Sequence, residues 1–266
     1  MFEKLYRKNL NCYISFCIIQ LVKGIKYRLK RVRVYPQRRI IMDVRELAVQ
    51  KKRELKGFLT VGTKYELKDA HDLSVAYTPG VAEPCLRIKD NEAESFELTC
   101  RSNMVAVVSD GTRVLGLGDI GAAAALPVME GKSLLFKKFG DVDCIPLVVD
   151  TKDADTLINT VKLLQKNFAG INLEDISSPK CYEIENRLKE ELEIPVFHDD
   201  QHGTAIACLA GVKGALRLVK KDLATAKIVV NGAGAAGANI ARLLYLAGAR
   251  DITLLVSSGV LHKDYK

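Results

Sequence analysis

Four acidic side chains follow two short apolar runs near the middle of this 266-residue chain, at 170–173 and 194–197. They are Glu174, Asp175, Asp199 and Asp200. With no cysteine or paired histidine beside them, carboxylates of this kind favour a hard divalent cation, Mg²⁺ or Mn²⁺, over zinc. Capping of the helices that follow is the alternative use of the same acids, and spacing alone does not decide between the two. His198 and His202 flank the group and are interpreted as supporting or surface residues.

A lysine and a tyrosine elsewhere in the chain could move protons. Lys132 follows a glycine in PVMEGKSLL, a segment with little surface character. Partial desolvation would lower the pKa of this amine and allow it to act as a base. Tyr77, in the AYTPG turn, could be a general acid. A solvated lysine and a packed aromatic ring are the alternatives, and these residues alone do not exclude them.

A glycine-rich turn near the C-terminus predicts a dinucleotide site. In the GxGxxG pattern, Gly232 permits the tight turn, Gly234 lets the backbone approach a pyrophosphate, and Gly237 allows strand and helix to pack closely. The phosphates would lie on the unpaired N–H groups of the helix that begins at Ala235 and Ala236. The alternative is a turn without a ligand. The next strand ends in Val-Ser-Ser, with no acid for a ribose, so NAD and NADP both remain candidates.

Strands and helices alternate along the chain, which predicts an α/β fold with a mainly parallel sheet. This catalytic domain would be followed by the first βαβ unit of a Rossmann-type dinucleotide-binding domain. Residues 113–117 are predicted to pair as a hairpin with the first strand, and residues 74–81 to form a turn. The predicted strands are 104–109, 143–149, 170–173 and 194–197. The predicted helices are 43–56, 121–139, 153–168, 179–193 and 203–220.

Positive charge is concentrated in the N-terminal segment. Residues 1–41 hold eleven Lys and Arg and one acid, although the whole chain has a net charge of only +8. A surface or nucleic-acid arm, an organelle transit sequence, and an extension upstream of a natural start at Met42 are all open for this segment. The extension is favoured, with an acidic-capped helix opening after Met42. We therefore expect domains at 1–41 (outside the fold), 42–221 (catalytic) and 222–266 (incomplete dinucleotide-binding).

The sequence disfavours a membrane-spanning protein and a disulfide-stabilised protein. The apolar run 13–22 is too short to cross a bilayer, which needs about 20 residues. Seven cysteines without a CxxC pair predict buried, reduced thiols and a cytoplasmic location. We expect no nucleic-acid partner, because the excess positive charge belongs to the arm rather than to the folded body.

Six stretches together resemble the malic enzymes, specifically the short prokaryotic type. The resemblance runs from about Met42 to the end of the chain, and it covers the catalytic domain and the beginning of the NAD(P) domain. Residues 1–41 have no counterpart. The matching stretches are LSVAYTPGVAEPC, SDGTRVLGLGDIG, PVMEGKSLLFKKFGDVD, INLEDISSP, PVFHDDQHGTA and VNGAGAAG.

This resemblance implies a role for each candidate residue. Tyr77 is expected to be the general acid and Lys132 the general base. Arg113 is expected to bind a malate carboxylate, which suits its two-pronged guanidinium. Asp199 is implied as the carboxylate beside the base. The implied metal ligands are Glu174, Asp175 and Asp200.

The implied activity is oxidative decarboxylation of malate to pyruvate and CO₂ with reduction of NAD or NADP, dependent on Mg²⁺ or Mn²⁺. Malolactic chemistry is a variant. We also expect a homo-oligomer, a dimer or higher. Because only one βαβ unit follows residue 222, the alternatives are a truncated chain that retains only oxaloacetate decarboxylation, and a non-catalytic remnant or oligomerisation partner.

Overall fold

A computed structural model describes the backbone of residues 38–262, with side chains from Val44 onward. Its centre is a four-stranded parallel sheet with the strand order β2-β1-β3-β4. The strands are β1 (Met104–Ser109), β2 (Asp143–Val148), β3 (Gly170–Leu173) and β4 (Val196–His198). The sheet confirms the predicted α/β class. Apolar β-branched runs without alternation suit such strands, because a parallel sheet is covered on its faces.

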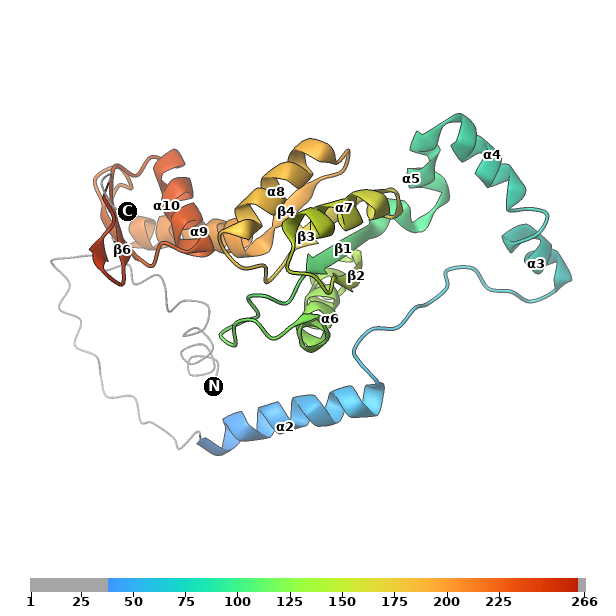
Figure 1. The fold of residues 1–266 in the computed structure, drawn as a ribbon, viewed down its shortest axis with the longest axis horizontal. Coiled ribbons are helices and arrows are strands. Elements are labelled where there is room, and N and C mark those ends of the chain that lie inside the picture. The colour runs from blue at the N-terminus through green and yellow to red at the C-terminus, as the bar shows by residue number, and fades with distance from the viewer. Residues whose placement is uncertain (1–37, 263–266) are drawn as a thin grey trace.

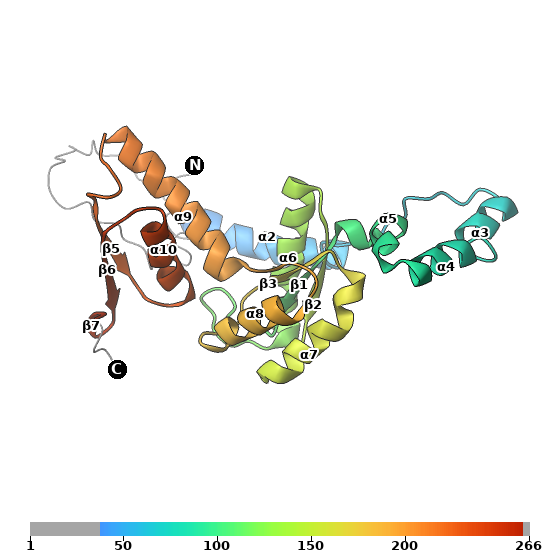
Figure 2. The ribbon, with the colours of Figure 1, turned by 90° about the horizontal axis from the view of Figure 1, so that it is seen from above.

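Helices cover the sheet from both sides (Figures 1 and 2). Helices α7 (Ala154–Leu164) and α8 (Lys180–Glu191) pack their apolar residues against β1 and β3, forming one continuous core. Helix α6 (Ala122–Gly140) packs against β1 and β2. The connections from β1 and from β3 run to opposite edges of the sheet, so a crevice is expected between the carboxyl ends of these two strands.

The chain then enters a second unit through α9 (Asp199–Leu218). The unit contains β5 (Lys227–Asn231), α10 (Ala235–Leu246), β6 (Asp251–Val256) and β7 (Gly259–Val260). β5 and β6 are parallel, and β7 is antiparallel to β6. The buried residues of α9 pack into the core of this unit together with β5 and α10. Packing therefore joins α9 to the second unit, although the predicted domain boundary lay after it.

The N-terminal helices lie apart from this body. Helices α3 (Ala70–Ala76) and α4 (Ala82–Asp90) contain no buried residue, and in both views they extend away from the sheet, at the opposite end of the molecule from α10. Short turns link them to β1, namely η1 (Glu92–Glu94), α5 (Ser95–Leu98) and η2 (Cys100–Asn103). We call residues 70–90 the arm. Helix α2 (Arg38–Leu55) reaches α6 through a Lys52–Glu130 ion pair.

Several sequence predictions are wrong in detail. Residues 113–117 do not pair with β1, because β2 and β3 already occupy both of its edges; Val114 forms only an isolated bridge to Gly118. Helix α2 begins at Arg38 rather than after Met42 and has no acid in its first turn. Residues 38–41 contain no glycine or proline that would prevent this earlier start. The predicted 74–81 turn is helical up to Ala76.

The cysteines also differ from prediction. None of the five in the described part of the chain is in a disulfide, but only Cys181 is buried, and Cys85 and Cys100 are exposed. The basic segment 1–37, with Cys12 and Cys17, lies outside the described residues. Among residues 38–262, no helix is both long and apolar enough to cross a membrane.

Candidate active site

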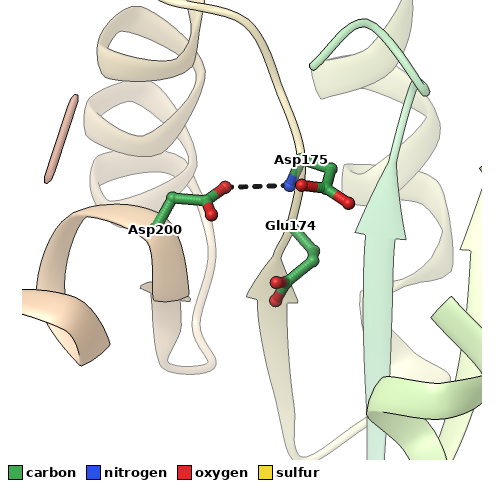
Figure 3. A group of neighbouring side chains, drawn as sticks. All are labelled: Glu174, Asp175 and Asp200. Carbon is green, nitrogen blue, oxygen red and sulfur yellow. Dashed lines mark hydrogen bonds between the residues drawn. The ribbon is translucent and has the colours of Figure 1, made fainter. Parts of the chain in front are cut away.

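Three carboxylates converge at the carboxyl ends of β3 and β4. Glu174 and Asp175 follow β3 directly, and Asp200 lies in the first turn of α9, immediately after β4. Because β3 and β4 are parallel neighbours, their ends bring these acids to one place (Figure 3). Each side chain offers an oxygen, and the three oxygens lie within 4.8 Å of one another. This spacing is suited to sharing one hard cation.

The backbone at Asp175 is held in an unusual conformation. Its φ is +54°, in the left-handed region that non-glycine residues seldom occupy. The Asp175 N–H donates to Asp200 Oδ2 at 2.9 Å, and the Asp175 carbonyl accepts from the Arg113 N–H at 3.0 Å (Figure 3 shows the former). These bonds fix the turn after β3. A strained backbone conformation that several hydrogen bonds hold in place is typical of functional sites.

Helix capping does not account for these acids. The N-cap of α9 is His198 and the N-cap of α8 is Pro179, and neither makes a side-chain capping bond. Helix α9 begins at Asp199, four residues earlier than predicted, so Asp199 and Asp200 occupy its first helical turn. Within the described part of the chain, one oxygen of the buried Asp175, Oδ2, has no hydrogen-bond partner. An orphaned carboxylate oxygen facing other carboxylates fits a cation better than it fits a cap.

The Lys132 amine joins the same group. Its Nζ lies 2.6 Å from Asp199 Oδ2 and 3.1 Å from Glu174 Oε2. Burial on its own lowers the pKa of Lys132, but the charges of Glu174 and Asp199 outweigh burial and hold that pKa above its ordinary value. The expectation of a lowered pKa is therefore wrong for the cation-free site. Two carboxylates contact this one amine, and their surplus negative charge stabilises the ammonium.

The same surplus raises the pKa of the acids. Burial raises the pKa of Glu174 to about 8, with Lys132 opposing this shift and the charges of Asp200 and Asp199 adding to it. Burial, followed by the charge of Asp200, raises the pKa of Asp175 to about 7. Both a base and its neighbouring acids thus hold protons more tightly than usual. A divalent cation would supply the positive charge that the site lacks, so the residues present fit such an ion.

Arg113 lies beside the acids, and Tyr77 does not. Arg113 is exposed on the loop that binds Asp175, and among the described residues its guanidinium forms no ion pair. Tyr77 ends α3 on the arm, with 68% of its surface exposed. In both ribbon views α3 lies far from β3 and β4. One chain therefore brings together the predicted base, substrate-binding residue and metal ligands, and leaves the predicted acid outside.

The amine also opens toward an apolar groove. Lys132 and Asp199 line a groove of about 720 Å³ together with Leu135, Phe136 and Phe139 of α6. Phe139 is 82% exposed. A large apolar surface beside a catalytic-type amine is a candidate contact for another segment or molecule.

The glycine-rich turn has the expected form. Gly232 follows β5 with φ +108°, and a Cβ at Gly237 would lie 1.8 Å from the Gly232 carbonyl oxygen, which explains both glycines sterically. A Cβ at Gly234 would meet nothing within 4 Å. That space is open at the start of α10, whose first residues are Ala235 and Ala236.

Two buried polar residues at the site were missed by the sequence analysis. Asn172, in β3, donates to Glu174 Oε2 at 3.1 Å, and Gln201 follows Asp200 in α9. Asn172 could have been found from the sequence, because it is a polar residue in an apolar strand. It lies two positions before Glu174, so both side chains point to the same face of the sheet. Gln201 carried no such signal, because its partners come from three other elements.

The fold and site define an α/β protein with a cation-type carboxylate cluster, followed by a dinucleotide-binding turn. Residues 59–154 match the malic enzyme N-terminal domain, and residues 201–253 match the malic enzyme NAD binding domain. The chain belongs to the malic enzyme family.

Individual relatives agree with this assignment. A bifunctional malic/malolactic enzyme of Bacillus subtilis is 52% identical over 222 residues, which are 84% of this chain and 54% of that protein. An NADP-dependent malic enzyme of Rhizobium meliloti is 50% identical over 209 residues, 78% of this chain and 28% of the relative. The structure of the NAD-dependent malic enzyme of Thermotoga maritima superposes with a TM-score of 0.79 at 45% identity, covering 82% of this chain and 58% of that one. The chain thus spans about half the length, or less, of these relatives.

Proposed function

We propose that this chain carries out the malic enzyme reaction, in which malate becomes pyruvate and CO₂ while NAD or NADP is reduced. The observation that carries the proposal is the convergence of Glu174, Asp175 and Asp200 beside the Lys132 amine. In the reaction the C2 hydroxyl loses a proton and C2 loses a hydride. The C3–C4 bond then breaks to release CO₂, and C3 gains a proton.

Glu174, Asp175 and Asp200 would hold Mg²⁺ or Mn²⁺. When bound, such a cation would supply a Lewis acid for the oxygen at C2, and the nicotinamide cofactor would supply the hydride acceptor. Asn172 orients Glu174 through its 3.1 Å hydrogen bond, and the left-handed turn orients Asp175. Both ligands after β3 are therefore fixed before a cation arrives, which reduces the entropy lost on binding.

Lys132 would take the hydroxyl proton. Asp199, at 2.6 Å, holds the amine in place. A cation's charge would offset the carboxylates that keep the lysine protonated, leaving burial, which favours the neutral base. Arg113 would bind a malate carboxylate, since its guanidinium is exposed beside Asp175 and makes no ion pair with the described residues.

Tyr77 would protonate C3, and it would come from a second copy of the chain. The arm that carries Tyr77 has no buried residue, and several of its apolar side chains are exposed, among them Leu73 (52%) and Leu86 (55%). The apolar groove beside Lys132 offers a surface of matching character. A homodimer with exchanged arms would complete each site and cover both apolar surfaces.

The second unit would bind NAD or NADP through Gly232, Gly234, Ala235, Ala236 and Gly237. The open space at Gly234 and the start of α10 suit a pyrophosphate. The proposed catalytic domain is residues 42–221, whose last helix, α9, also packs against the second unit, and the proposed dinucleotide-binding portion is residues 222–266.

The test is to incubate the purified chain with malate, Mn²⁺ and NAD or NADP and to record reduced cofactor. The proposal predicts that the parent forms reduced cofactor. Lys132→Ala should form it on the order of 10²–10⁴-fold more slowly. Lys137→Ala, whose lysine pairs with Asp141 and Asp143 on the surface, is the control. A Lys132→Ala chain as fast as the parent would refute the assigned base.

One narrower function is favoured by where the residues lie. The proposed metal ligands, base and acid all precede residue 201, so oxaloacetate decarboxylation needs none of the dinucleotide-binding portion. Pyruvate formed from oxaloacetate without reduced cofactor formed from malate would identify this activity. Lactate formed from malate would identify malolactic chemistry. Neither product, with the chain binding a full-length relative in a pull-down, would identify an oligomerisation partner.

A further inference from the structure

A buried amide links the carboxylate cluster to the dinucleotide-binding unit. Gln201, 3% exposed, contacts Glu185 on α8, His198 at the end of β4 and Asn239 on α10. The proposed reaction assigns no task to any of these four residues. Their side chains connect four elements next to Asp200, namely α8, β4, α9 and α10.

The orientation of the Gln201 amide follows from its partners. Its Nε2 donates to Glu185 Oε2 at 2.9 Å, and its Oε1 accepts from Asn239 Nδ2 at 2.9 Å. The Asn239 amide is itself fixed, because Nδ2 also donates to the Ala235 carbonyl at 3.1 Å. Turning the Gln201 amide over would place oxygen against carboxylate and NH₂ against NH₂, so only one orientation satisfies both neighbours.

That orientation determines where His198 carries its proton. The Gln201 Nε2 is also within hydrogen-bonding distance of His198 Nδ1. An amide NH₂ can only donate, so Nδ1 must accept and the ring proton must be on Nε2. His198 is fully buried. Its Nε2 has no hydrogen-bond partner among residues 38–262 but lies 3.4 Å from Asp200 Oδ2. The Nε2–H is thus the nearest donor on this ring to a proposed metal ligand.

We propose that Gln201 is a positioning residue, which fixes His198 in the Nε2–H tautomer and so orients the Asp200 carboxylate. The inference rests on the proposed cation site, because it gives Asp200 the role of a ligand. Glu185 anchors Gln201 and is held in turn by His202 Nε2 and Lys189 Nζ, each at 2.6 Å. Asn239 and Ala235 belong to α10, so the helix that starts at the glycine-rich turn is bonded to the same amide. Substituting a residue that orients a metal ligand commonly weakens metal affinity about 10–100-fold.

The first test records the tautomer directly. Nitrogen NMR of the cation-free chain with labelled histidine distinguishes Nε2–H from Nδ1–H, and the chain has only four histidines to assign. We expect Nε2–H at His198 in the parent and in the control Gln165→Leu, and a shift toward Nδ1–H in Gln201→Leu. Gln165 is a half-buried glutamine that bonds Lys162 and Glu193 instead. Nδ1–H in the parent, or an unchanged tautomer in Gln201→Leu, would overturn the inference.

The second test measures Mn²⁺ affinity by calorimetry. Gln201→Leu should bind Mn²⁺ on the order of 10-fold more weakly than the parent and Gln165→Leu. If Gln201→Leu does not fold, Asn239→Ala replaces it. Loss of the Asn239 donor allows the Gln201 amide to turn over. This variant should therefore show a mixture of His198 tautomers and a smaller loss of Mn²⁺ affinity than Gln201→Leu. Equal Mn²⁺ affinity in parent and variant would overturn the role of Gln201 and leave the cation site standing. A parent that binds no Mn²⁺ would refute the cation site itself. The NMR measurement would then still show whether Gln201 fixes the tautomer of His198.

Discussion

The strand-end cluster and the arm are opposite kinds of structure. Glu174 and Asp175 are buried, hydrogen-bonded and fixed by a strained turn, whereas Tyr77 lies on helices with no buried residue. The first region is organised entirely within one chain. The second offers apolar surface and a phenol that no other element among residues 38–262 covers. On the proposed function, cation binding would therefore need a single chain, whereas proton donation by Tyr77 would need a second copy.

The largest effect expected from this difference is recovery of activity by mixing. Lys132→Ala and Tyr77→Phe chains should each be nearly inactive in forming pyruvate from malate with Mn²⁺ and NAD or NADP. If arms are exchanged, co-refolding the two in equal amounts gives mixed dimers with one intact site, and roughly a quarter of the parent rate. Pyruvate release measures it.

The control for mixing is Lys132→Ala combined with a chain carrying both substitutions, which cannot assemble an intact site. Recovery in that control would show an unrelated cause. An inactive mixture of the two single variants would place both groups in the same chain and contradict arm exchange.

Removing one ligand from the cluster should have the next largest effect. Asp175→Asn deletes a charge and the orphaned oxygen, so Mn²⁺ affinity should fall by at least about 100-fold. Calorimetry measures the affinity. Glu183→Gln, which alters an exposed acid on α8, should bind as the parent does. Tyr77→Phe should also bind Mn²⁺ normally, because the arm takes no part in holding the ion.

Two glycines in the dinucleotide turn should separate folding from binding. Gly237→Ala places a Cβ against the Gly232 carbonyl and should destabilise the chain by about 1–3 kcal/mol in denaturant unfolding. Gly234→Ala meets nothing within 4 Å, so stability should be unchanged while binding of NAD or NADP weakens. Unchanged nucleotide binding in Gly234→Ala would argue that the turn carries no ligand.

The smallest effect is a pH dependence of stability in the cation-free chain. The folded pKa of Glu174, about 8, lies above its ordinary value of 4.5, and that of Asp175, about 7, lies above 3.8. The folded state therefore binds more protons, and its stability falls as pH rises from about 4 to 8. Relative to Glu174→Gln, the parent should lose several degrees of Tm between pH 5 and pH 8.5. Mn²⁺ should abolish the loss. A constant difference in Tm would refute the raised pKa of Glu174.

The grouping of the acids could be predicted from the sequence because it depends on short local segments. The runs that form β1 and β3 were identified to the residue, because each is a short apolar stretch ended by polar residues. Parallel neighbours then had to bring Glu174 and Asp200 together.

Properties that depend on the whole arrangement were not predictable. The pKa of Lys132 depends on the charges of Glu174 and Asp199, which two other segments bring to it, and burial alone suggested the wrong direction. The 113–117 hairpin failed because the pairing of β1 on both edges is a property of the sheet. The location of Tyr77 away from the acids could not be read from a turn motif.

The most direct measurement is a crystal structure of the chain grown with Mn²⁺, with anomalous diffraction used to locate the ion. One Mn²⁺ peak per chain, in contact with oxygens of Glu174, Asp175 and Asp200, is the result our account requires. Density without an ion there, or an ion bound by other residues, would contradict it.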